Sequence, residues 1–162
     1  MTEKDRQNNQ RRLALWMKLT ASVLAILIIL GLIFLYYYSY KSLGPEADDI
    51  RAFSFFPAVT GTISIFIIFI FGKVASEIGR GNSFSIENVN YFRRMACLGG
   101  ILSISYIVRL IYISVCGKAT IFRTGYCIVM FILGALFLSI CYILSCLIKN
   151  AYEMKLENDL TI

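Results

Sequence analysis

The sequence predicts an all-α integral membrane protein, a four-helix bundle with both termini in the cytoplasm. Its 162 residues are 58% hydrophobic and only 16% charged, with a mean hydropathy of +0.70, whereas a soluble domain is about 45–50% apolar and about 25% charged. The apolar residues form four long blocks, and the lysines and arginines gather on one side of these blocks. Together these observations exclude a soluble globular fold.

Each apolar block carries no charge or a single one and predicts one transmembrane helix: 19–40, 52–72, 95–117 and 124–148. About 20 helical residues cross a hydrocarbon core of about 30 Å, so every block is long enough. The first block, with 22 uncharged residues, is longer than the apolar core of a cleavable signal peptide, which is about 7–15 residues. The segments outside the blocks are too short to fold around cores of their own. The chain is expected to be a single domain, 1–162, in contact with the lipid bilayer.

The distribution of basic residues predicts the orientation of these spans. The segments 1–18, 73–94 and 149–162 hold 11 lysines and arginines, whereas the opposite side holds 4, or 5 if Arg109 is counted. Since Lys and Arg accumulate in cytoplasmic segments, these three segments are predicted to be cytoplasmic. Trp16 marks the inner membrane interface, and an aromatic belt marks the outer one: Tyr36, Tyr37, Tyr38, Tyr40, Phe53, Phe55 and Phe56.

The polar segments predict where the helices begin and end. The N-terminal residues 1–12 are polar and are expected to be mobile. Pro57 is placed in the first turn or two of the second helix, where proline costs least. That helix has no stop signal before Gly79 or Gly81, which are expected to cap it. Ser85 is a good N-cap for a helix that continues into the third span.

Two features support this helix start and the packing of the spans. Glu87 lies in the first turn, near the positive end of the helix, and Phe84 and Val89 have the spacing of a hydrophobic staple. Small residues four apart, which allow helices to approach closely, favour a packed bundle and leave the oligomeric state open. These pairs are Ala21 and Ala25, Ala58 and Thr62, Ala96 and Gly100, Gly99 and Ser103, and Ala135 and Ser139.

The composition argues against an enzyme, a cofactor or a metal site. Histidine is absent, which removes the commonest general base and metal ligand. No nucleophile elbow, phosphate-binding glycine loop or positioned carboxylate pair is evident. The five cysteines lie in the apolar blocks and are read as packing residues, with Cys116 and Cys127 the one pair that could meet as a disulfide. The net charge of +6 is attributed to the basic flanks of the spans and not to direct nucleic-acid binding.

Arg109 is the one ionisable group well inside a predicted span. A functional interpretation makes it an anion site or a gating charge, because such groups are retained in membranes mainly for function. The alternative, which we favour, is that it reaches the outer surface or pairs with Glu46, Asp48 or Asp49.

Two cytoplasmic stretches are more specific than the spans. The first, 81–89, reads Gly-Asn-Ser-Phe-Ser-Ile-Glu-Asn-Val and is followed by Phe92, Arg93, Arg94 and Ala96; the second, 157–162, reads Glu-Asn-Asp-Leu-Thr-Ile. The chain resembles the bacterial membrane family called domain of unknown function 2975 in its four spans, this helix start and an Asp-Leu-Thr ending. It departs from that pattern at Ser83, where proline is frequent, and at Phe92, where leucine is usual.

The resemblance implies a location in the bacterial plasma membrane and no established activity. Members are often encoded beside a small helix-turn-helix DNA-binding regulator, which implies that regulator as a partner. We therefore expect a non-enzymatic protein that docks a cytoplasmic partner through these two stretches, although capping alone could explain the first. The residues expected to bind the partner are Phe84, Glu87, Asn88, Val89, Arg93, Arg94, Asp159, Leu160 and Ile162. The alternatives are a small transporter or channel subunit, or a bacteriocin-type immunity protein.

Overall fold

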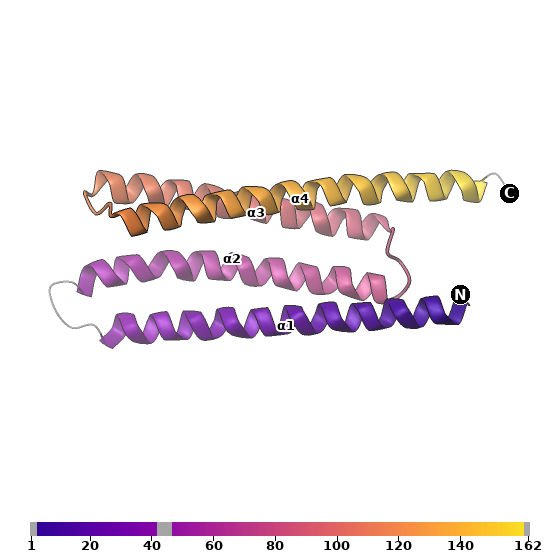
Figure 1. Ribbon diagram of the computed structural model, residues 1–162, viewed down its shortest axis with the longest axis horizontal. Helices are drawn as coiled ribbons and strands as arrows, with labels where there is room; N and C mark the ends of the chain where they lie inside the picture. Colours follow the sequence, from indigo (N-terminus) through magenta and orange to yellow (C-terminus); the bar gives the residue numbers. More distant parts are fainter. Residues whose placement is uncertain (1–2, 42–46, 161–162) are drawn as a thin grey trace.

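Four long helices make up the protein. The computed structural model describes residues 3–41 and 47–160, and this part of the chain contains no strand. The helices are α1 (Glu3–Lys41), α2 (Ala47–Gly79), α3 (Ile86–Val115) and α4 (Ile121–Leu160) (Figure 1). Each predicted span falls on a different helix, so the all-α fold with four membrane-length helices is confirmed.

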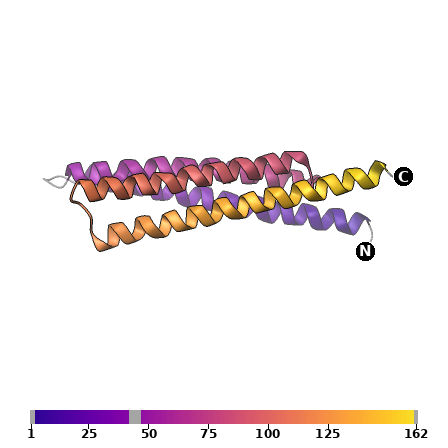
Figure 2. The ribbon, with the colours of Figure 1, turned by 90° about the horizontal axis from the view of Figure 1, so that it is seen from above.

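Each helix packs against the next one along the chain. Contacts join α1 with α2, α2 with α3 and α3 with α4, and within the described residues no Cα atom of α1 lies within 8 Å of one of α4. Successive helices run antiparallel, and α4 crosses α3 at an angle (Figure 2). The N-terminal end of α1, the C-terminal end of α4 and the α2–α3 turn therefore lie at one end of the molecule (Figure 1).

The buried core lies nearer to that end. Val74, Met95, Ala96 and Cys141 form its centre and come from α2, α3 and α4, while Met17 of α1 packs against them. The four helices are thus joined around small and flexible apolar side chains, which suits close helix packing in a membrane.

Small residues bring α3 and α4 together, including Gly99 and Ser103, a pair whose spacing favoured a packed bundle. A Cβ atom at Gly134 would overlap the Oγ of Ser103, and one at Gly99 would lie 2.8 Å from a ring carbon of Phe137. The Ser103 hydroxyl also donates a hydrogen bond of 3.3 Å to the Phe131 carbonyl across this interface. The missing side chains at the two glycines are what permit this approach.

The outward faces of the helices are apolar. Large hydrophobic side chains are exposed along all four helices. The apolar area that they expose is larger than soluble proteins leave in contact with water. Hydroxyl groups on these faces donate to carbonyls of their own helix, as those of Ser22, Thr62, Ser114 and Ser139 do, so few polar groups need water. The helices indicate a multi-pass membrane protein.

The structure corrects two expectations about helix ends. The polar segment expected to be mobile is helical from Glu3, so α1 begins well before its apolar block. Since α2 begins at Ala47, Pro57 lies inside the helix and not in its first two turns. By contrast, α2 ends at Gly79 and α3 follows Ser85 without a break, as predicted.

Two helices extend beyond the α2–α3 turn. Ala14 of α1 lies opposite Gly79, the last residue of α2, and α1 begins 11 residues earlier, at Glu3. Ser145 of α4 lies beside Val89, and α4 continues to Leu160. At 1.5 Å per residue, α1 extends about 16 Å past the end of α2. On the same scale α4 extends about 22 Å past Ser145, and thus about 18 Å past Ile86, the first residue of α3.

Candidate functional site

The α2–α3 turn is the first candidate site, and its backbone is closed by helix-capping bonds. The Gly81 amide donates to the Ile78 carbonyl at 3.0 Å and the Asn82 amide to the Glu77 carbonyl at 3.0 Å. Gly81 has a φ of +86°, which a residue without a side chain adopts readily. This is the glycine-capped helix end that the sequence predicted.

Asn88 fastens the turn to the start of α3. Its side-chain amide donates to the carbonyls of Asn82 and Ser83, each at 3.1 Å. Its backbone amide donates to Oγ of Ser85 at 3.3 Å, which confirms Ser85 as the N-cap. Asn88 is only 1% exposed, so it holds the turn from inside.

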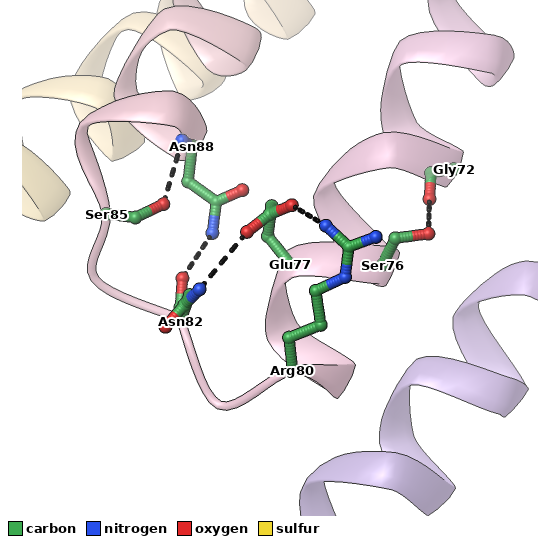
Figure 3. A network of polar contacts seen from close by, with 7 residues as sticks. All are labelled: Gly72, Ser76, Glu77, Arg80, Asn82, Ser85 and Asn88. Atoms are coloured by element: carbon green, nitrogen blue, oxygen red, sulfur yellow. Dashed lines mark hydrogen bonds and ion pairs between the residues drawn. The ribbon is translucent and has the colours of Figure 1, made fainter.

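Glu77 and Arg80 complete the network shown in Figure 3. One Glu77 oxygen accepts from Nη1 of Arg80 at 2.9 Å, and the other accepts from Nδ2 of Asn82 at 3.4 Å. The buried Oδ1 of Asn88 has no hydrogen-bond partner among the described residues. The side chains of both helices thus fix the turn, and sequence analysis did not single out Glu77.

The predicted binding residues of the first stretch divide into a buried and an exposed group. Asn88 and Val89 are buried and Val89 is only 2% exposed, whereas Glu87, Arg93 and Arg94 are exposed. Phe84 is 57% exposed, so it does not share the burial of Val89 that a hydrophobic staple would give.

Beside Phe84 lies an apolar residue that sequence analysis missed. Ile86 is 41% exposed, and as the first residue after the Ser85 cap it lies outside the apolar face of α3. The position of Ile86 directly after the predicted N-cap was the feature of the sequence that could have identified it as a candidate binding residue. The exposed group therefore combines two apolar residues with charges of both signs.

The second stretch is described only in part. Asp159 and Leu160 belong to α4, but their side chains, and Ile162 as a whole, lie outside the described residues. Residues 153–158 are exposed on the part of α4 that extends past the turn. The tail is thus helical as far as Leu160.

Arg109 forms the second candidate site, with aromatic side chains around it. It is 7% exposed, and its guanidinium lies 4.6 Å from the centre of the Phe56 ring. Phe56 packs edge-on against Tyr106 at 5.4 Å, and Tyr106 against Tyr126 at 6.0 Å. Phe56 thus packs against both Arg109 and Tyr106.

The burial of Arg109 comes from packing between helices. Its guanidinium stacks on Phe56, a favourable cation–π arrangement. The side chains of Glu46, Asp48 and Asp49, its predicted partners, lie outside the described residues.

The cysteines and acids offer little metal chemistry. All five cysteines are free thiols, including Cys116 and Cys127. In the part of the chain that the structure describes, no group of three or more Cys, Asp or Glu residues could hold a metal ion.

The comparisons with known proteins agree with the predicted resemblance. A family described as a protein of unknown function, DUF2975, matches residues 24–162. No curated protein and no solved structure is significantly similar to the chain.

Proposed function

We propose, from the premise that the chain belongs to the DUF2975 family, that it is a non-enzymatic membrane protein that docks a cytoplasmic partner at its α2–α3 turn. The partner that suits the proposal is a small helix-turn-helix regulator, whose access to DNA would depend on whether it is held at the membrane. The chain would lie in the bacterial plasma membrane with both termini inside.

The observation that carries the proposal is the exposure of Phe84 and Ile86 on a fixed turn. Capping bonds, the buried Asn88 and the Glu77 network hold the backbone beneath them. Two apolar residues presented at fixed positions can be buried by a partner at little cost in conformational entropy. An exposed aromatic residue of this kind is typical of an interface hot spot.

Charged residues surround this apolar pair. Glu87 follows Ile86 in the first turn of α3, and Arg93 and Arg94 lie two turns further along the same helix, all exposed. Charges at the rim of an interface contribute mainly to the rate and specificity of association. The affinity of the turn for the partner therefore comes chiefly from Phe84 and Ile86, and the tail residues Asp159, Leu160 and Ile162 are proposed to complete the interface.

A small transporter or channel subunit is the second candidate, and the burial of Arg109 favours it. A cation that is 7% exposed within an apolar helix bundle is costly, and such groups commonly serve ion or anion pathways. The stack on Phe56 gives Arg109 a structural role that does not require transport.

The test of docking is a matched pair of phenylalanine variants. Phe84→Ala should weaken co-purification of the regulator encoded beside the gene by about tenfold or more, the effect of losing one hot-spot residue. Phe122→Ala is the control, because Phe122 is 90% exposed and is the second residue of α4, a helix that starts at the end of the molecule opposite to the α2–α3 turn (Figure 1). Equal partner recovery with the two variants, both inserted at wild-type levels, would contradict the proposal.

A further inference from the structure

A basic cavity lies between α1 and α2, apart from the exposed side chains proposed for docking. It has a volume of about 350 Å³ and is lined on the α1 side by Arg11 and Lys18 and on the α2 side by Arg80. Cavities of about 300–1,000 Å³ are of the size that ligands occupy. Among the described residues that line it, none is acidic.

Small residues line the cavity where α1 and α2 approach each other closely. A Cβ atom at Gly79 would lie only 2.9 Å from the Cβ of Ala14, so the two backbones are close there. Both residues line the cavity, together with Leu15 and Ser76. The Ser76 hydroxyl already donates to the Gly72 carbonyl at 3.1 Å, which leaves the basic groups as the donors for a ligand.

The charge of the cavity comes mainly from α1. Arg80 is paired with Glu77 at 2.9 Å, which offsets part of its charge while leaving other guanidinium N–H groups for a second acceptor. Arg11 and Lys18 are exposed and lie two turns apart on one helix. A cavity with these donors fits an anion, and guanidinium groups suit phosphate oxygens in particular.

The position of the cavity identifies the source of that anion. Leu15, which lines it, also lines an adjoining hollow of about 220 Å³ with Arg12, Trp16 and Leu19. Trp16 is 68% exposed, and tryptophan is enriched at the membrane interface. Basic residues therefore lie where lipid headgroups lie, directly beside exposed apolar side chains that acyl chains can cover.

We infer that this cavity binds the phosphate of an anionic phospholipid, with its acyl chains along Leu15 and Leu19. Basic pockets between transmembrane helices are suited to such headgroups. The inference depends on neither Phe84 nor Ile86, so it stands or falls separately from partner docking.

Trp16 provides the measurement, since it is the only tryptophan in the chain. The full-length protein is placed in phosphatidylcholine vesicles that contain a minority of brominated phosphatidylglycerol, whose bromine atoms quench a neighbouring indole. Quenching of Trp16 should exceed that given by the same fraction of brominated phosphatidylcholine. Equal quenching by the two lipids in the wild-type protein overturns the inference, and this result needs no variant to fold.

Charge-matched variants locate the site. Arg11→Gln/Lys18→Gln should weaken phosphatidylglycerol binding about 25-fold, at about fivefold for each basic residue at a membrane surface. Arg93→Gln/Arg94→Gln removes the same charge from the exposed face of α3 and should change binding little. Equal losses of phosphatidylglycerol binding in the two variants would mean that the basic end of the molecule attracts the lipid as a whole. This result would overturn the assignment of the site to the cavity.

A competition experiment separates lipid from free anion. Inorganic phosphate at millimolar concentration should leave the excess quenching by phosphatidylglycerol in place, because a soluble anion lacks the contacts of the acyl chains. If phosphate abolishes that excess at constant ionic strength, the ligand is a soluble anion and the lipid assignment is wrong.

Discussion

The Ser145 hydroxyl of α4 donates a hydrogen bond of 3.1 Å to the Val89 carbonyl in the first turn of α3. Ser145 is 2% exposed, so this bond is protected from water. It joins residues 56 positions apart in the chain, and it lies next to Asn88, which fastens the α2–α3 turn. The turn is thereby tied to α4 as well as to α2.

Removing this bond should loosen the pairing of α3 and α4. Ser145→Ala is expected to lower the free energy of unfolding by about 0.5–1.5 kcal/mol, since an interhelical hydrogen bond in a membrane contributes about that much. Thermal unfolding in detergent measures the change. Ser139→Ala is the control, because the Ser139 hydroxyl is exposed and bonds within α4. An equal loss of stability in both variants would assign the effect to helix propensity.

A side chain at Gly134 should force α3 and α4 apart. Gly134→Ala places a methyl group on the Ser103 hydroxyl and is expected to cost about 1–3 kcal/mol by overpacking. Gly125→Ala in the same helix meets no atom within 4 Å and should be neutral or stabilising. Adding Ser103→Ala to Gly134→Ala should restore part of the lost stability, because it removes the overlapping oxygen.

The helices were predictable because each depends on its own sequence. The apolar blocks, the Ser85 cap and the Gly81 turn are local signals, and all of them are confirmed. The close approach of Gly99 to Phe137 followed partly from the small-residue spacing. No local signal, however, stated which helix each small residue would face.

The contacts between distant residues could not be predicted in the same way. Phe56 packs on Arg109, and Ser145 bonds to Val89, only after the helices have taken their relative rotations. The side-chain amide of Asn88 donates to the carbonyls of Asn82 and Ser83. The sequence predicted a turn at Gly81, but it did not specify the directions in which these carbonyls point. Its neighbour Glu87 is exposed, so one predicted stretch contains both structural and accessible residues.

Arg109→Leu distinguishes docking from transport. The variant loses the stack on Phe56 and is expected to be less stable by up to about 2 kcal/mol. Under the docking proposal the variant should still insert into the membrane and co-purify with the regulator, and it should give the same cellular phenotype as the wild-type protein. Loss of the phenotype with normal insertion and normal regulator recovery would favour a transporter or channel.

Deletion of residues 157–162 tests the contribution of the tail. The truncated protein should insert and accumulate normally, because α4 retains its apolar length and its contacts with α3. It should lose co-purification of the regulator and any effect on that regulator's target genes. Retention of both would make the tail a passive terminus and would confine docking to the turn.

Cysteine labelling tests the proposed orientation. In a variant without the five native cysteines, a membrane-impermeant maleimide applied to whole cells should label a cysteine at Asp48 and should leave one at Asn82 unlabelled. Positive-inside topology is the reason for this expectation. Labelling at Asn82 after cell lysis is the control for accessibility, and labelling there before lysis would reverse the orientation.

The extension of α4 past the α2–α3 turn has a consequence for long-range electrostatics. With the turn at the headgroup layer, the end of α4 stands about 18 Å from the membrane surface, about twice the screening length of about 8 Å at physiological ionic strength. The surface potential of anionic lipids has decayed at that height. The carboxylate of Glu157, three residues before that end, is exposed and stands about 13 Å from the membrane surface, where the bilayer neither repels it strongly nor competes strongly for a basic partner.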